Sequence, residues 1–195
     1  MAAPLSNDEV LARYDRYVRE FLEVLNVCPF ARRAREGGTL RRAVLRGEAP
    51  TVETCVAALM EVTSGPPEAV DVAVLILPEF PGTASEFSRY VSAVRQPFTR
   101  QSNPPGGFYL VAMHPEHVKD LSNPDRAVAF MRRTPHPSIQ VARASVMQTA
   151  RGTGTNAAGE STSEVVARVG LENVKAMGEA QVEALLNAIR GGLPR

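Results

Sequence analysis

Apolar residues recur at helical spacing in the first part of the chain. This broad apolar face predicts an amphipathic helix and comprises Val10, Tyr14, Tyr17, Val18, Phe21, Leu22 and Leu25. Ser6 followed by Glu9 has the pattern of a capping box, so we expect Ser6 to be the N-cap. The helix should end near Asn26, because Pro29 disfavours helical geometry at Cys28.

Beyond this helix, short apolar runs alternate with amphipathic segments. Three strands are predicted, at residues 40–46, 70–77 and 108–113. The run at 70–77 is nearly continuous, as in a central strand that is covered on both faces. Helical patterns follow Pro29, Thr51, Thr83 and Asn123, whereas residues 139–147 fit either a helix or a strand.

The order of these elements predicts an α/β fold. Helices between successive strands favour a small parallel or mixed sheet of three or four strands, covered by helices. We expect residues 1–148 to form this single domain and residues 149–160 to be a flexible linker that is cut first by proteases. Residues 161–195 should form C-terminal helices that dock on the domain, starting at a capping box from Ser161 to Glu164.

Composition narrows the class of protein. The 195 residues are 44% apolar and 22% charged, with a net charge of +1. This balance argues against a dedicated nucleic-acid or membrane-surface protein, because both normally carry a basic excess. There is no signal-peptide pattern and no run of about 20 apolar residues, so we expect a cytoplasmic protein. Walker, nucleophile-elbow, CxxC and dinucleotide motifs are also absent from the sequence.

Cys28 is the first residue that suggests chemistry. If Pro29 is the first residue of a helix, Cys28 lies at or near the N-cap, where free N–H groups and the positive end of the helix dipole favour a thiolate. Arg32, Arg33 and Arg35 would add positive potential. The alternative is that Cys28 is a small buried side chain between two helices. Cys55 lies on the inward face of a regular helix, which predicts a structural role.

The three histidines fall later, within one short window. His114 follows the strand at 108–113, at the edge where α/β sheets usually bind ligands, and is either a general base, a ligand or a polar turn residue. His117 comes three residues later, and His136 lies between two prolines in a loop. Cys28, His114 and His136 match zinc ligands by type, but their scattered spacing leads us to predict no metal site.

Arginine supplies 20 of the 22 basic residues. Arg132, Arg133 and Arg143 flank the loop that contains His136. They form either a solvated surface or a site for a phosphate or carboxylate group.

Three motifs together resemble the domain of unknown function 1415 family of bacterial proteins: Leu25–Ala31, Met113–Pro115 and Arg132–Pro137. The resemblance covers roughly residues 21–146, and the segment after Thr149 lies outside it. It implies that Asn26, Cys28, Pro29, His114 and Arg133 form one constellation. Where the family often carries an aromatic residue between the two prolines of the last motif, this chain has His136. The resemblance implies no activity, because the function of the family is uncharacterised.

Two hypotheses for the function follow. In the first, the protein is a small enzyme or ligand-binding protein in which Cys28 and His114 lie within direct or water-bridged reach. Its binding residues for a small anionic ligand would be Asn26, Arg133, Arg143 and His136. In the second, it is a non-catalytic interaction module in which Cys28 is structural. The sequence specifies no cofactor, substrate or oligomeric state.

Overall fold

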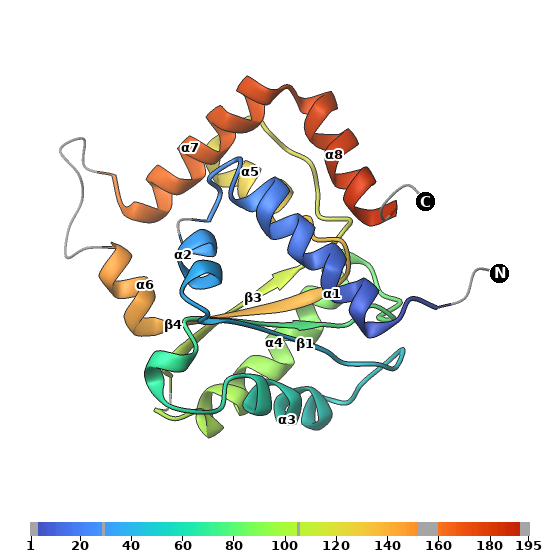
Figure 1. The fold of residues 1–195 in the computed structure, drawn as a ribbon, viewed down its shortest axis with the longest axis vertical. Helices are drawn as coiled ribbons and strands as arrows, with labels where there is room; N and C mark the ends of the chain where they lie inside the picture. Colours follow the sequence, from blue (N-terminus) through green and yellow to red (C-terminus); the bar gives the residue numbers. More distant parts are fainter. Residues whose placement is uncertain (1–3, 29, 105, 152–159, 192–195) are drawn as a thin grey trace.

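A four-stranded mixed sheet forms the centre of the molecule (Figure 1). The structure is a computed structural model that describes residues 4–28, 30–104, 106–151 and 160–191. The strands have the order β1-β2-β4-β3. The strand β1 is parallel to β2, and β4 is antiparallel to both of its neighbours. This confirms the predicted α/β class. The bounds are Leu40–Val44 for β1, Val72–Ile76 for β2, Phe108–Met113 for β3 and Ser138–Arg143 for β4.

Two helices, α3 (Val52–Val62) and α4 (Ala84–Gln101), cover one face of the sheet. A short 3-10 helix, η2 (Pro67–Ala69), leads from α3 into β2. The side chains between these helices and the sheet form a closely packed apolar cluster that includes Cys55, Leu59, Phe87 and Phe98. Every residue of β2 is buried, as the continuous apolar run predicts.

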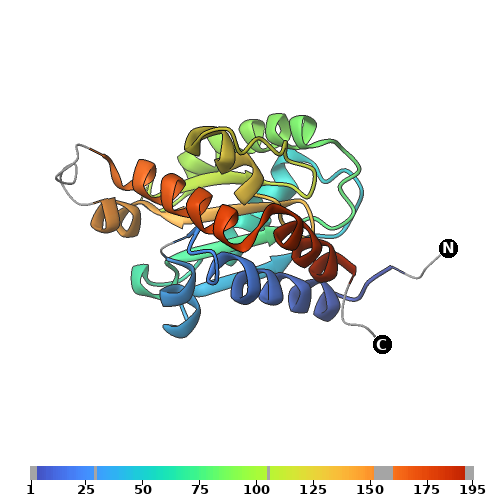
Figure 2. The same ribbon diagram turned by 90° about the horizontal axis from the view of Figure 1, so that it is seen from above.

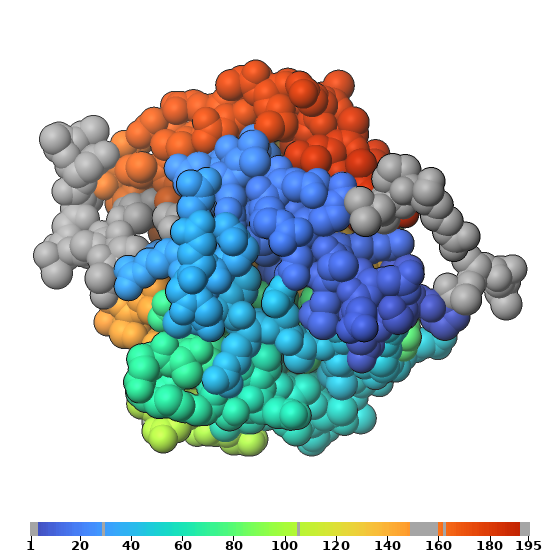
Figure 3. Space-filling view, viewed as in Figure 1, coloured from blue at the N-terminus to red at the C-terminus, as the bar shows by residue number. Residues whose placement is uncertain are grey.

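The other face is covered by more elements (Figure 2). The helices α7 and α8 lie across it between α5 and α1, and α6 follows directly from β4. The space-filling view shows α7 and α8 along one margin of the molecule, beside the α1 and α2 segments (Figure 3). The bounds are Asn7–Arg16 for α1, Tyr17–Leu22 for the π-helix η1, Ala31–Glu36 for α2, Pro124–Met131 for α5, Ala144–Arg151 for α6, Thr162–Met177 for α7 and Glu179–Gly191 for α8.

The helix starts predicted from capping residues agree with the structure, whereas α2 begins at Ala31, later than the start predicted at Pro29. Ser6, Thr83 and Ser161 each form a complete capping box with the glutamate three residues later. Thr51 and Asn123 cap α3 and α5. The first helix keeps the predicted apolar face, but η1 widens its last turns before the chain leaves the helix, where Asn26 has a φ of 49°.

Other details differ from the sequence-based expectation. Residues 139–147 divide between β4 and α6, so the ambiguous segment holds a strand followed by a helix. Helix α6 reaches Arg151, so the start of the expected linker is helical, while residues 152–159 lie outside the described residues. Helix α7 packs on α5, and α8 packs on α1 and η1. No helix in the described part of the chain is long and apolar enough to cross a membrane.

Candidate ligand-binding cavity

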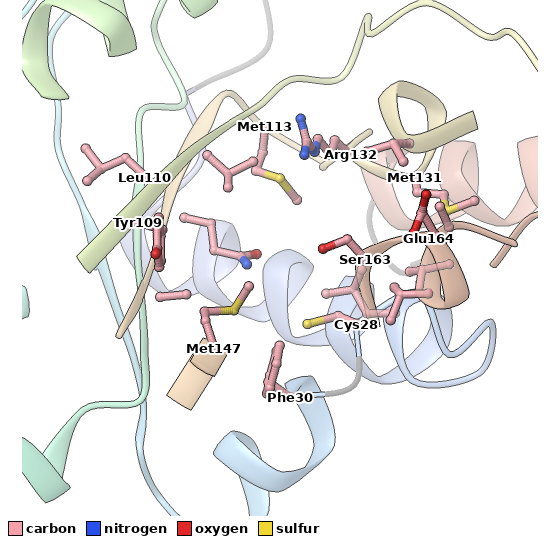
Figure 4. Close-up of a pocket in the computed structure, with 18 of the residues that line it drawn as sticks. Cys28, Phe30, Tyr109, Leu110, Met113, Met131, Arg132, Met147, Ser163 and Glu164 are labelled. Atoms are coloured by element: carbon pink, nitrogen blue, oxygen red, sulfur yellow. The ribbon is translucent and has the colours of Figure 1, made fainter. Parts of the chain in front are cut away.

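A partly open cavity of about 460 Å³ lies on the face of the sheet that carries α5 and α7 (Figure 4). This volume is within the range of small-molecule sites. Most of its lining is apolar. Its polar and charged lining residues are Cys28, Tyr109, Asp125, Arg132, Gln140, Ser163 and Glu164.

The floor of the cavity is formed by β3 and β4. Side chains alternate between the two faces of a strand, so Tyr109, Val111 and Met113 line the cavity, while Phe108 packs into the cluster on the other face. In the antiparallel register Val111 lies opposite Gln140. Gln140 therefore projects a single amide into an otherwise apolar strand surface.

Helix α5 forms one wall. Its residues that line the cavity recur at helical spacing. They are Asp125, Val128, Met131 and, directly after the helix, Arg132. The C-terminal end of α5 is held in place because the Tyr17 hydroxyl donates a hydrogen bond to the Met131 carbonyl, at 3.2 Å. Tyr17 is fully buried in η1, so the end of this wall is attached to the core.

The second wall is α7, which approaches closely because of a glycine. A Cβ at Gly170 would lie 2.7 Å from the Met131 Sδ and 3.0 Å from a Val27 methyl group. Asn173 on the same helix donates a hydrogen bond from Nδ2 to the Leu25 carbonyl, at 2.8 Å. Helix α7 thereby fixes both α5 and the segment that leads to Cys28.

Among the described residues, Arg132 is the one basic side chain that lines the cavity. Within the described part of the chain, no carboxylate forms an ion pair with it and its guanidinium donates no hydrogen bond. The residue is exposed, although desolvation lowers the pKa of its guanidinium, which nevertheless stays charged at neutral pH. In Figure 4 it lies beside Met113, across the cavity from Phe30 and Met147.

Cys28 lines the cavity, but as a thiol. Burial raises the pKa of Cys28, and this effect exceeds the opposing effect of the Phe30 and Ala31 N–H groups. The expectation of a stabilised thiolate is therefore wrong. The N-cap of α2 is Phe30, not Cys28. The physical reason is that desolvation of a thiolate at this position costs more free energy than the N–H groups at the start of the short helix α2 contribute.

His114 lies on the other side of the sheet. Its ring contacts Phe87 of α4, and its Nε2 donates to the Gly82 carbonyl at 3.0 Å. Its Nδ1 accepts from the Glu116 N–H at 3.1 Å, which fixes a neutral tautomer, and burial lowers its pKa. His114 does follow the C-terminal end of β3, as predicted, but β3 is an edge strand.

The prediction that Cys28 and His114 share a site is wrong. Cys28 packs against the apolar cluster under α1 and also borders a small void with Leu40 and Val72, where β1 and β2 begin. The two residues thus lie on opposite faces and near opposite ends of the sheet. The chain order explains this, because Cys28 precedes β1 on one face, whereas the chain reaches His114 after passing along the other face through α3 and α4.

The other predicted binding residues are also dispersed. Arg133 pairs with Glu183 at 3.1 Å. Arg143 is buried, stacks over Phe108 and donates to the Val70 carbonyl. Asn26 is exposed in the turn before Cys28.

His136 lies at the end of the sheet where β4 begins, and burial lowers its pKa to about 4. None of the residues that we predicted to bind the anion lines the cavity. Among the described residues, no group of three or more histidine, cysteine, aspartate or glutamate side chains is placed to hold a metal ion.

Gln140 is not among the predicted binding residues, and Arg132 is predicted only as one of three arginines that flank the His136 loop. Two features of the sequence indicate them. Gln140 is a lone amide in an apolar run that fits either a strand or a helix, and Arg132 continues the face of α5 formed by Asp125 and Val128. Both signals depend on knowing which face each element turns inward.

The chain was compared with known families and matches a family model. The model of a family described as a protein of unknown function, DUF1415, matches residues 9–184. The chain belongs to this family. The DUF1415 match extends beyond the resemblance seen in the motifs and includes all of α7 and the first part of α8, so the wall built on Gly170 is part of the family region. No curated protein and no solved structure matches the chain.

Proposed function

We propose that this protein binds a small amphipathic anion in the cavity between β3, α5 and α7, with Arg132 receiving the anionic group. The observation that carries the proposal is a guanidinium without an ionic partner among the described residues, on the lining of a largely apolar cavity. Pockets of this kind bury an apolar ligand body and orient it with a few polar groups.

The other arginines near the cavity support this assignment by contrast. Arg126 and Arg133, on or just after α5, pair with Asp120 and Glu183. Arg168 on α7 pairs with Glu160 and Glu172. Arg132 thus keeps its donors available for a carboxylate or phosphate group, which a guanidinium binds in a bidentate manner.

Two carboxylates also line the cavity and bear on the orientation of the ligand. Glu164 caps α7 by accepting the Ser161 N–H at 2.7 Å. The Ser161 hydroxyl, and then this N–H, lower the pKa of the Glu164 carboxyl. Asp125 lies seven residues before Arg132, about 10 Å away along the helix axis. An anionic group is therefore favoured at the Arg132 end and disfavoured at the Asp125 end.

A binding role fits the cavity better than catalysis by Cys28 and His114. The Cys28 thiol has a raised pKa, and none of the three histidines lines the cavity. The alternative of an arginine-rich surface for an acidic partner has less support. Arg35, Arg42 and Arg46 pair with Glu23, Asp15 and Glu79 of this same chain.

The test is a titration with the fluorescent amphipathic anion 8-anilinonaphthalene-1-sulfonate. We expect saturable binding to the folded protein and about 10–100-fold weaker binding by R132Q, because a hydrogen bond to a charged group is lost. R126Q is the matched control, since Arg126 lies on the same helix and does not line the cavity.

Urea unfolding should show that both variants remain as stable as the parent protein. The proposal fails if the parent protein shows no saturable binding, or if R132Q binds the probe as tightly as R126Q.

A further inference from the structure

Sulfur-containing side chains gather at this cavity. The chain has two cysteines and six methionines, and four of these eight residues line it. They come from four separate segments of the chain: Cys28, Met113, Met131 and Met147. A single apolar helix face would not produce this arrangement, so the convergence is a property of the cavity.

The thioethers border the cavity from different sides. In Figure 4 Met113 lies beside Arg132, Met147 lies across the cavity next to Phe30, and Met131 closes a third side. The aromatic rings of Phe30 and Tyr109 complete the lining. Met131 is held at the Gly170 contact, whereas Met147 is only partly buried on α6.

This lining favours an aromatic ring over a saturated one. A methionine sulfur is polarizable and packs favourably at the edge of an aromatic ring, and its unbranched side chain adapts to the outline of a ligand. Aromatic side chains add edge-to-face and offset-stacked contacts. A saturated ring of the same size would gain the hydrophobic contacts but not these additional ones.

We propose that the ligand is an aromatic carboxylate, whose ring lies among Met113, Met131 and Met147 while its carboxylate binds Arg132. This inference rests on the proposed function and specifies its ligand class. Gln140, on the strand between these groups, is placed to hydrogen-bond a polar substituent of the ligand.

The experiment compares two acids that differ only in ring saturation, 4-phenylbutanoate and 4-cyclohexylbutanoate. Protein with ¹³C-labelled methionine methyl groups is titrated with each acid and followed by NMR. Single methionine-to-leucine variants assign the signals. We expect the aromatic acid to bind at least several-fold more tightly, and its ring current to shift the methyl signals of Met113, Met131 and Met147.

The chain supplies internal controls. Met60 and Met177 do not line the cavity, so their methyl signals should stay unchanged. M147L keeps the side-chain volume but removes one thioether, and it should reduce the ratio of the two affinities, which is the preference for the aromatic acid over the cyclohexyl acid.

Each result decides a distinct question. Equal, Arg132-dependent affinities for the two acids would overturn the aromatic preference and leave the proposed function standing. Ring-current shifts at Met60 or Met177 with none at the cavity methionines would overturn the assignment of the site. Failure of both acids and of the sulfonate probe to bind would overturn the proposed function itself.

Discussion

The two faces of the sheet are covered in different ways. On one face, α3 and α4 pack directly against the strands, and the interface is filled by buried side chains such as Cys55, Leu59 and Phe87. On the other face, several helices and the segment around Cys28 meet over β3 and β4 and leave a cavity of about 460 Å³. One face of the sheet therefore carries a filled core alone, and the other carries a core against β2 and a cavity over β3 and β4.

The difference follows from what the helices pack against. The helices α3 and α4 pack directly on strands of the sheet, and their buried side chains join one apolar cluster with it. On the cavity side, α5 and α7 pack on each other and on the first helical segment. Side chains such as Met131 and Arg132 are therefore left lining the space between α5 and β3. The face covered by α3 and α4 is thus filled by apolar side chains, whereas the other face combines a core under α1 and α8 with the cavity of the proposed function.

The largest expected effect is a difference in the loss of stability between a substitution on the filled face and one at the cavity. Phe87→Ala on the filled face should lower the free energy of unfolding by about 3–5 kcal/mol, because Phe87 is fully buried and its removal leaves a void. Met147→Ala at the cavity should cost less than about 1.5 kcal/mol, because this side chain is only partly buried. Urea unfolding measures both. Similar losses for the two variants would contradict the contrast.

A smaller effect is expected at the wall of the cavity. Gly170→Ala should lower the free energy of unfolding by about 1–2 kcal/mol, because the new methyl group would displace Met131 and press on Val27. Met131 lines the cavity, so its displacement should also weaken binding of the sulfonate probe. The matched control is Gly191→Ala at the end of α8, where a Cβ meets no atom within 4 Å. This control should change stability by less than about 1 kcal/mol.

The sequence predicts the elements of this fold well, because their signals are local. Capping boxes at Ser6, Thr83 and Ser161, and the buried run of β2, depend on residues within a few positions of one another. The segment that could not be assigned, residues 139–147, changes from strand to helix at Arg143 without a proline or glycine to mark the boundary.

The site was harder to predict because it depends on strand order and on faces. Cys28 and His114 each lie in a plausible position, but no local pattern says that the chain changes faces between them. Arg132 and Arg133 are neighbours in sequence, yet only the first lines the cavity, while the second pairs with Glu183 from α8. Which of two adjacent arginines is available depends on a helix about 50 residues later.

The smallest effect on stability, and the most direct comparison of the faces, comes from the two cysteines. Cys55 is fully buried beside Tyr90, and burial raises its pKa to about 11. Cys28 is partly exposed at the cavity, and its pKa is also raised. We expect Cys55→Ser to cost about 1 kcal/mol for burying a hydroxyl, and Cys28→Ser to cost less.

Thiol labelling then distinguishes the solvent access of the two cysteines from the ionisation of their thiols. An aromatic disulfide reagent should modify Cys28 in the folded protein and reach Cys55 only when the α3–α4 face opens. Because the thiolate reacts and both pKa values are raised, labelling of Cys28 should keep increasing with pH above 9 instead of levelling off near neutrality. The bound sulfonate probe should slow labelling of Cys28 and leave Cys55 unaffected. Faster labelling of Cys55 than of Cys28 would contradict this assignment of the two faces, because Cys55 would then be the more accessible thiol. A Cys28 rate that levels off below pH 8 would contradict the raised pKa of Cys28.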